Sequence, residues 1–176
     1  PVSASHVTIS ELMLPSHTNF SGKIHGGYIL SLLDQIAFAS ASKFSGNYCV
    51  TASVDTVNFL QPIEVGELVT MKASVNYVGR SSMIVGIRVE AENIQTGAIK
   101  HCNSSYFTMV AKDANGKSVA VPGLQLKTLN DVRRFSNCLK QIELKKEHEE
   151  HEEEFDYCSA ENLANITKYN IQLQLQ

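Results

Sequence analysis

Residues 24–42 read IHGGYILSLLDQIAFASAS, and Asp34 is the one formally charged side chain among them. Apolar side chains fall on both sides of a helical wheel drawn through this stretch, a pattern typical of a helix buried nearly all round. The pattern starts at the Gly26-Gly27 pair and stops near Phe44, before the turn residues SGN. We therefore predict a long buried helix from about Gly26 to Phe44.

The carboxylate of Asp34 is unusual in such a helix. Desolvation disfavours the charged form of a carboxyl group and raises its pKa. A buried aspartate therefore needs a hydrogen-bond partner or has a chemical role, and desolvated carboxylates are candidates for the second. A buried Asp34 that only hydrogen-bonds a neighbouring strand or subunit is the alternative, and this stretch alone does not decide between the two.

The overall composition describes an ordinary globular protein. The chain has 176 residues, 43% hydrophobic and 19% charged, and a net charge of −3, which gives no electrostatic reason to expect nucleic acid. Its four cysteines are widely spaced and form no C-x-x-C pair, so a reducing compartment is expected. The first residues, PVSASHVTIS, do not resemble a signal peptide, and the polar residues of the 24–42 stretch argue against a membrane span. We expect a cytoplasmic protein.

The rest of the first 125 residues is typical of strands. Apolar and polar residues alternate over 69–77 and 83–91, further strand patterns cover 48–60 and 99–111, and residues 5–14 fit a strand or an extended lead-in. Short turns between strands indicate antiparallel neighbours. An antiparallel sheet wrapped on one long helix is an α+β design. It leaves a helix face and a sheet edge uncovered, which favours a dimer.

A different pattern begins after Pro122-Gly123. Apolar residues recur at three- or four-residue spacing from Leu129 to Ile142 and predict an amphipathic helix. This helix leads into EHEEHEEEFD, residues 147–156, in which seven of ten residues are acidic. We predict one domain over 1–125 and a helical, acidic extension over 126–176, whose last residues, NIQLQLQ, are disordered or pair with a sheet edge. A metal site at His148 and His151 is disfavoured because no third ligand is spaced to complete it.

The residues before and within the predicted helix suggest a chemistry. Free N–H groups at Gly26 and Gly27, together with the positive end of the helix dipole, would stabilise a developing oxyanion. Asn19, in the preceding loop, offers an amide that can hold a water or a carbonyl group. With Asp34 as general base or nucleophile, these groups suit the hydrolysis of an acyl derivative.

Four stretches carry a resemblance to a known family. They are NFSGKIHGGYILSLLD (19–34), TASVDTVNFLQPIEVGELV (51–69), VGRSSMIVGIRVEAENIQTG (78–97) and YFTMVAKD (106–113). In order and spacing, residues 7–122 resemble the hotdog-fold acyl-CoA thioesterases of the cytosolic acyl-CoA hydrolase class. The resemblance implies a hotdog fold and hydrolysis of acyl-CoA to a carboxylic acid and CoA, with no cofactor and no metal. It does not cover the last 50 or so residues.

The resemblance also implies roles for individual residues. Asn19 and Asp34 act together across a dimer interface, one from each protomer, and the amide around Gly27 polarises the thioester carbonyl. The remaining positions implied to contact CoA are His25, Gly26, Gly79, Arg80, Ser81 and Ser82. A plain hairpin without a ligand is the alternative for the turn at 79–82. Because one module carries both Asn19 and Asp34, the chain should form a homodimer, with a trimer of dimers expected.

Other functions on the same fold compete with hydrolysis. In hydratases and dehydratases of this fold a histidine works with a carboxylate. His25 lies nine residues before Asp34, half a turn round the helix, so the two cannot face one substrate from the same chain, and a structural role is favoured for His25. A non-catalytic acyl-CoA sensor would usually carry a DNA-reading module, and neither a helix-turn-helix nor a basic patch is recognisable. The expected partner is acyl-CoA, with no nucleic acid and no membrane.

Overall fold

The computed structural model describes residues 1–55, 57–154, 156–172 and 174, with residues 151–154 described by their backbone. The chain forms two compact units, Pro1–Cys138 and Leu139–Gln176. The first ten residues of the predicted C-terminal helix therefore belong to the first unit. The predicted domain boundary at 125/126 stays a prediction.

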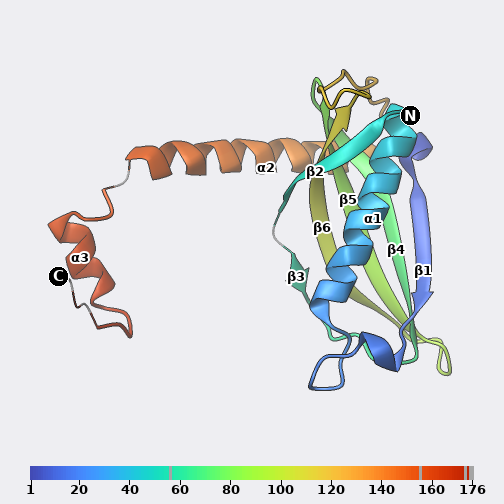
Figure 1. Ribbon diagram of the computed structural model, residues 1–176, viewed down its shortest axis with the longest axis horizontal. Helices are drawn as coiled ribbons and strands as arrows, with labels where there is room; N and C mark the ends of the chain where they lie inside the picture. Colours follow the sequence, from blue (N-terminus) through green and yellow to red (C-terminus); the bar gives the residue numbers. More distant parts are fainter. Residues whose placement is uncertain (56, 155, 173, 175–176) are drawn as a thin grey trace. The chain divides into compact units, whose positions relative to one another are not determined.

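The central helix, α1, extends over Gly26–Ser45 and confirms the predicted helix (Figure 1). His25 precedes it with extended backbone angles and caps its first turn. Gly46 ends it in the left-handed conformation, at φ 70°, which glycine adopts without the steric cost of a Cβ atom. The Gly-Gly pair and the SGN turn thus mark both ends of the helix as expected.

All strands belong to one antiparallel sheet, ordered β1-β4-β5-β6-β2, with β3 also pairing with β6 (Figure 1). The strands are β1 Val7–Leu12, β2 Tyr48–Val54, β3 Asn58–Phe59, β4 Glu67–Val78, β5 Ser82–Asn93 and β6 Ile99–Lys112. Two short 3-10 helices flank β1, at Val2–Ser5 and Pro15–His17. The predicted strand pattern at 48–60 is divided between β2 and β3, and Thr56 lies outside the described residues. The predicted α+β hotdog architecture is confirmed.

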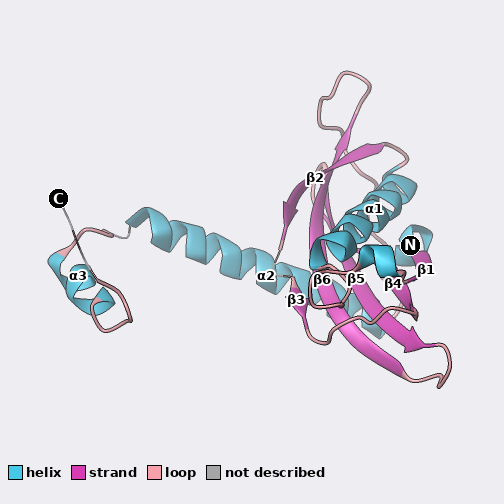
Figure 2. Cartoon of the chain, turned by 60° about the horizontal axis from the view of Figure 1, so that its bottom comes forward, coloured by secondary structure: helices cyan, strands magenta, loops and turns pink. Residues whose placement is uncertain are grey.

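The core lies between α1 and one face of this sheet (Figure 2). The side chains of Ile29, Leu33 and Ile36 are each at most 1% exposed. They pack in one cluster with strand residues such as Val85 and Met109, both fully buried. Burial of a side chain of this size contributes about 1.5–3 kcal/mol, so this face of α1 is the main attachment of the helix to the sheet.

The opposite face of α1 is not buried, and the expectation of a desolvated Asp34 is wrong for the single chain. Asp34 is exposed, and Leu30 and Phe38, one turn before and after it, are 36% and 38% exposed. The physical reason is geometric, because a curled sheet of this size covers one face of a central helix and leaves the other open. Two large apolar side chains on an open helix face form a surface that a partner could cover.

The second unit contains the rest of α2 (Leu129–Glu154) and α3 (Ala160–Ile166). The predicted helix after residue 129 is confirmed, whereas α3 is an element that the sequence pattern did not reveal. Ser159 caps α3 by accepting a hydrogen bond from the N–H of Asn162. Residues 170–172 and 174 form no helix or strand, and the other residues of the NIQLQLQ stretch lie outside the described chain. Within the described chain, no helix has the length and apolarity that crossing a membrane would require.

A buried serine joins the N-terminus to the sheet and to α1. The Ser5 hydroxyl accepts a hydrogen bond from the Val75 N–H (2.8 Å) and donates one to the Val2 carbonyl oxygen (2.6 Å). The Ser40 hydroxyl of α1 donates to the Ser5 carbonyl oxygen (2.7 Å). Val75 lies where the β4–β5 register shifts, so Ser5 satisfies an N–H group at an irregular point of the ladder.

Replacing Ser5 with alanine should therefore destabilise the fold by about 1–3 kcal/mol, because the Val75 N–H would be left buried without an acceptor. Urea unfolding followed by circular dichroism measures the change. Ser3→Ala, at an exposed position two residues earlier, is the matched control and should change stability by less than about 0.5 kcal/mol. Equal stability of the two variants would contradict this role for Ser5.

Candidate active site

An open groove of about 620 Å³ lies beside Asp34. It is lined by Ile9, Asp34, Gln35, Phe38, Tyr48, Cys49, Val50 and Thr51. Most of these residues come from α1 and β2, but Ile9 belongs to β1, at the other end of the strand order. The sheet is therefore curled enough to bring residues of both edge strands to the exposed face of α1. A groove with apolar walls and one carboxylate is the kind of site that binds a small molecule.

Within the groove, Asp34 is held by a strand residue that the sequence analysis did not identify. The hydroxyl of Thr51, on β2, donates a hydrogen bond to Asp34 Oδ1 at 2.5 Å. Asp34 Oδ2 makes no hydrogen bond with the described residues. A hydrogen bond to a carboxylate is among the stronger ones in proteins, so Thr51 fixes the orientation of the group and leaves one oxygen available. Sequence alone could not find this pair, because the two residues meet only through the packing of α1 on β2.

The N–H groups at the start of α1 are not equivalent. The Gly27 N–H donates to His25 Nδ1 (2.9 Å), and a Cβ atom on Gly27 would lie only 2.9 Å from that imidazole ring. The Gly26 N–H has no acceptor among the described residues. The predicted oxyanion donor at Gly27 is thus engaged in the cap, and Gly26 offers the free donor. This contact gives His25 a structural role, and its Nδ1 must be the unprotonated nitrogen.

The side chain of Asn19 closes the loop before α1. Its Oδ1 accepts hydrogen bonds from the Ser21 N–H (2.9 Å), the Ser21 hydroxyl (2.7 Å) and the Lys23 N–H (3.2 Å). The Asn19 N–H also donates to the Lys23 carbonyl oxygen (2.7 Å). The amide oxygen is therefore fully used, and the Nδ2 group, a pure donor, is what Asn19 can offer to another molecule.

A second network supports the same end of α1. Tyr28, in the first turn, donates its phenolic hydrogen to the Glu11 carboxylate, and its ring stacks on His17 at 3.9 Å between centroids. The hydrogen bond to Glu11 raises the pKa of Tyr28 above its usual value, with desolvation adding to the effect. Because His17 also accepts the His25 N–H through its carbonyl oxygen (2.8 Å), this network fixes the loop that carries Asn19.

The structure does not bring all predicted site residues together in one chain. Asp34 lies eight residues into α1, about 12 Å along the helix axis from Gly26 at 1.5 Å per residue. A single thioester group cannot contact both positions. Asn19 and Gly26 belong to one end of the helix, and Asp34 with Thr51 belongs to its middle.

The turn at Gly79, Arg80, Ser81 and Ser82 lies at the other end of α1 (Figure 1). The Ser81 carbonyl oxygen accepts the Ala111 N–H (2.9 Å), beside the start of β2, which follows the C-terminus of the helix. Gly79 closes the turn by donating to the Ser82 carbonyl oxygen (2.8 Å), and a Cβ atom there would lie 2.7 Å from the Ser82 hydroxyl. The Arg80 side chain is exposed and available to a ligand.

Among the described residues, no group of three His, Cys, Asp or Glu side chains is arranged to hold a metal ion. The predicted independence from metals and cofactors stays a prediction.

Comparison with known proteins identifies the family. The family model described as the thioesterase superfamily matches residues 21–98, which include α1, Asp34 and the turn at 79–82. Over 147 residues the chain is 33% identical to the uncharacterized acyl-CoA thioester hydrolase YkhA of Bacillus subtilis, covering 84% of this chain and 86% of that protein. The chain belongs to the thioesterase superfamily. This thioesterase is also 44% identical over 137 residues to protein VdlD of Helicobacter pylori, covering 78% of each chain.

Solved structures agree with this assignment. A hexameric acyl-CoA thioesterase superposes on the chain with a TM-score of 0.82 at 35% identity, covering 84% of this chain and 95% of that one. The acyl-CoA hydrolase of Staphylococcus aureus, solved with butyryl-CoA and CoA, gives a TM-score of 0.79 at 29% identity, covering 87% and 93%. Three more structures of that hydrolase each carry one alanine substitution, of an asparagine, of an aspartate or of a threonine. The aspartate follows the asparagine by 15 residues, and the threonine follows the aspartate by 17 residues. Asn19, Asp34 and Thr51 have the same spacing.

The capping role of His25 predicts how substitutions behave. His25→Ala should destabilise this thioesterase by about 1 kcal/mol, because the Gly27 N–H loses its acceptor. His25→Asn should restore most of the stability, since asparagine is a favoured N-cap residue. Chemical unfolding of the three proteins measures both effects. An alanine variant as stable as the parent, or an asparagine variant no better than alanine, would contradict the cap.

Proposed function

We propose that this thioesterase hydrolyses acyl-CoA thioesters, with Asp34 and Asn19 as the reacting pair. The observation that carries the proposal is the Asp34 carboxylate in an open groove, held through one oxygen by Thr51. The matching spacing of the asparagine, aspartate and threonine that were substituted in the Staphylococcus aureus hydrolase supports it. The function thus rests on a site as well as on family membership.

The chemistry needs a base or nucleophile and a means of polarising the thioester. In the base form, Asp34 Oδ2 takes a proton from a water molecule whose oxygen attacks the carbonyl carbon. The C–S bond then breaks, the acid is released, and the CoA thiolate takes up a proton. In the alternative form the carboxylate attacks the carbonyl carbon itself, the C–S bond breaks, and CoA leaves as the thiolate and takes up a proton. Water then hydrolyses the resulting mixed anhydride to the free acid and the Asp34 carboxylate. In both forms Thr51 keeps the carboxylate in one orientation.

The polarising groups lie at the N-terminal end of α1, whereas Asp34 lies near its middle. The Nδ2 group of Asn19 and the N–H of Gly26 are hydrogen-bond donors that have no acceptor among the described residues. A thioester oxygen placed between them would have its developing negative charge stabilised, with the helix dipole adding to the effect. The Gly27 N–H can join them if His25 releases it. The imidazole of His25 then lies next to the bound substrate, as a CoA contact would require.

Two copies of the chain are needed to complete such a site. About 12 Å separates the donors from the carboxylate along α1, so the donors of one copy must face the carboxylate of another. The exposed apolar side chains beside Asp34 and the unpaired outer edge of β2 supply a surface for this contact. We propose a homodimer joined sheet edge to sheet edge, three of which assemble into a hexamer, as the hexameric thioesterase of the same fold supports.

The turn at Gly79, Arg80, Ser81 and Ser82 is proposed to hold the nucleotide part of CoA. Its exposed guanidinium and two hydroxyl groups suit phosphate oxygens. No cofactor or metal is needed for the steps above. Four free cysteines, three of them buried, fit a cytoplasmic protein, which we also propose here.

Removing the carboxylate should stop turnover. Asp34→Asn keeps the size of the side chain and should lower kcat/KM for short acyl-CoA substrates by at least about 10²-fold. Thr51→Val, which keeps the shape but loses the hydroxyl, should lower it by about 10- to 100-fold, the value of a hydrogen bond to a charged group. Release of free thiol measures both. Asp156→Asn, which removes a carboxylate in the second unit, is the control and should keep the activity of the parent. Full activity of Asp34→Asn would contradict the catalytic assignment of Asp34.

A hybrid experiment tests the shared site. Asn19→Ala and Asp34→Asn chains are each expected to be nearly inactive, and unfolding and refolding them together should restore part of the activity. A mixed dimer contains one site with both residues intact. Light scattering before the assay verifies that the protein is a dimer or a larger even-numbered assembly. Verified hybrids without activity would place both residues in the site of one chain, and a stable, active monomer would exclude the shared site altogether.

A further inference from the structure

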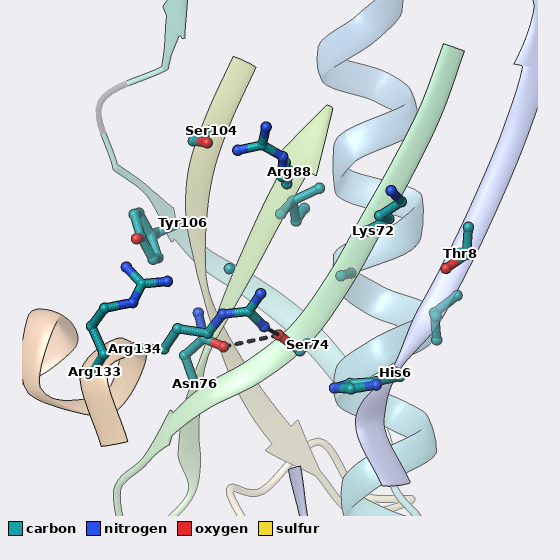
Figure 3. A pocket seen from close by; sticks show the side chains of 14 residues that line it. His6, Thr8, Lys72, Ser74, Asn76, Arg88, Ser104, Tyr106, Arg133 and Arg134 are labelled. Atoms are coloured by element: carbon teal, nitrogen blue, oxygen red, sulfur yellow. Dashed lines mark hydrogen bonds between the residues drawn. The ribbon is translucent and has the colours of Figure 1, made fainter. Parts of the chain in front are cut away.

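The face of the sheet that points away from α1 carries a hollow of about 400 Å³ (Figure 3). Met71, Ala73 and Val75 belong to the core cluster that includes α1. Because successive strand residues point to opposite faces, Lys72 and Ser74 lie on the other face, where they line the hollow. Residues of β1, β5, β6 and the start of α2 complete its wall. The hollow is thus on the opposite face of the sheet from the groove of Asp34.

The charge of the hollow is strongly one-sided. Lys72, Arg88, Arg133, Arg134 and His6 line it, and no Asp or Glu is among its lining residues. Just beside it, Glu90 pairs with Lys72 Nζ (2.6 Å) and Arg88 Nε (2.7 Å). These two hydrogen bonds lower the pKa of Glu90 to about 2, so Glu90 is ionised at neutral pH.

Two of the arginines form no ion pair among the described residues, although Arg134 interacts at longer range with Asp131. Arg133 Nη2 donates to Asn130 Oδ1 (2.8 Å), and Arg134 Nη1 donates to the Ser74 hydroxyl (3.1 Å). Both partners are neutral. Four cations therefore line the hollow, with the carboxylate of Glu90 beside Lys72 and Arg88 and the carboxylate of Asp131 near Arg134, which leaves a net charge of about +2 before His6 is counted.

A buried amide adds a donor at the floor of the hollow. Asn76 is only 5% exposed, and its Oδ1 accepts a hydrogen bond from the Ser74 hydroxyl (2.9 Å). Its Nδ2 group has no acceptor among the described residues and is therefore a free donor at the lining of the hollow. Gly86 makes the space, because a Cβ atom there would lie 2.1 Å from Asn76 Nδ2. Figure 3 shows this amide between the arginines of α2 and the strand residues.

We propose that this hollow binds a small molecule carrying at least two phosphate groups. The lining offers donors and positive charge from two sides, with Arg133 and Arg134 reaching in from α2 and Lys72 and Arg88 rising from the strands (Figure 3). Guanidinium groups match phosphate oxygens with two parallel hydrogen bonds. The volume is in the range of small-molecule sites and exceeds the needs of one phosphate group. The hollow contains none of the residues of the Asp34 groove or of the turn at 79–82 that is proposed for the nucleotide part of CoA, so the phosphates belong to a molecule separate from the substrate.

Isothermal titration calorimetry of the full chain with inorganic pyrophosphate tests the site, with inorganic phosphate and sulfate compared at equal ionic strength. Pyrophosphate should bind more tightly than the single-centre anions. The double substitution Arg133→Gln and Arg134→Gln should weaken it at least about 10-fold, since two charge-assisted contacts are lost. Lys140→Gln with Lys145→Gln removes the same charge from the same helix outside the hollow and should leave the affinity unchanged.

Arg134 also donates a hydrogen bond to Ser74, so the arginine variant changes the attachment of α2 as well as the charge of the hollow. A second variant separates these two effects. Ser104 is exposed at the wall of the hollow, so Ser104→Glu adds a carboxylate without disturbing the core. It should weaken pyrophosphate binding as strongly as the arginine variant, with an unchanged circular dichroism spectrum. The proposal is overturned if pyrophosphate does not bind, or if both variants bind it like the parent.

Steady-state kinetics test whether the bound molecule is separate from the substrate. An unchanged KM for acyl-CoA in the arginine variant supports a separate molecule. A raised KM at unchanged kcat would assign the hollow to the nucleotide of the substrate and would overturn this proposal. Calorimetry does not depend on hydrolysis, so binding is tested apart from the proposed activity. Occupation by the acidic run 147–156 of another copy is the competing outcome. In that case light scattering would show a smaller assembly for the arginine variant than for the parent, and the parent would not bind pyrophosphate. This result would overturn the proposal.

Discussion

The packing of one face of α1 into the curled sheet is the constraint on which the rest of the first unit depends. Ile29, Leu33 and Ile36 are almost completely buried, and each contributes about 1.5–3 kcal/mol of burial free energy. Rotating the helix by one residue, about 100°, would expose these side chains and bury Asp34 without a compensating charge. The position of the carboxylate in the groove is therefore set by apolar packing on the opposite side of the same helix.

The two faces of the sheet have different chemistry for the same reason. A period of two residues sends Met71, Ala73 and Val75 into the core and leaves Lys72 and Ser74 to the other face. The first face holds a helix and presents a carboxylate at its edge. The second face carries the cations and the amide donor of Asn76. A sheet of six strands thus separates an acidic groove from a basic hollow by the thickness of one layer.

Much of the fold could be predicted because its signals are local. The Gly26-Gly27 pair and the turn at Gly46 fix the ends of α1, and simple alternation reveals β4 and β5. Contacts between distant parts of the chain could not be predicted. Thr51 meets Asp34 only because β2 packs beside α1, and Arg134 reaches Ser74 across 60 residues of sequence. Solvent exposure was misjudged for the same reason, since a helical wheel shows which side chains are apolar but not how far the sheet extends around them.

The hydrogen bonds of the loop before α1 do not by themselves require asparagine rather than aspartate at position 19. Every hydrogen bond that closes this loop through the side chain goes to one acceptor oxygen, which a carboxylate would supply equally well. The NH₂ group of Asn19 contributes nothing to the loop. An aspartate at this position could accept the same hydrogen bonds but would replace the donor with a negative charge. In the reaction proposed above it is the NH₂ donor, and not the closing of the loop, that distinguishes asparagine from aspartate at position 19.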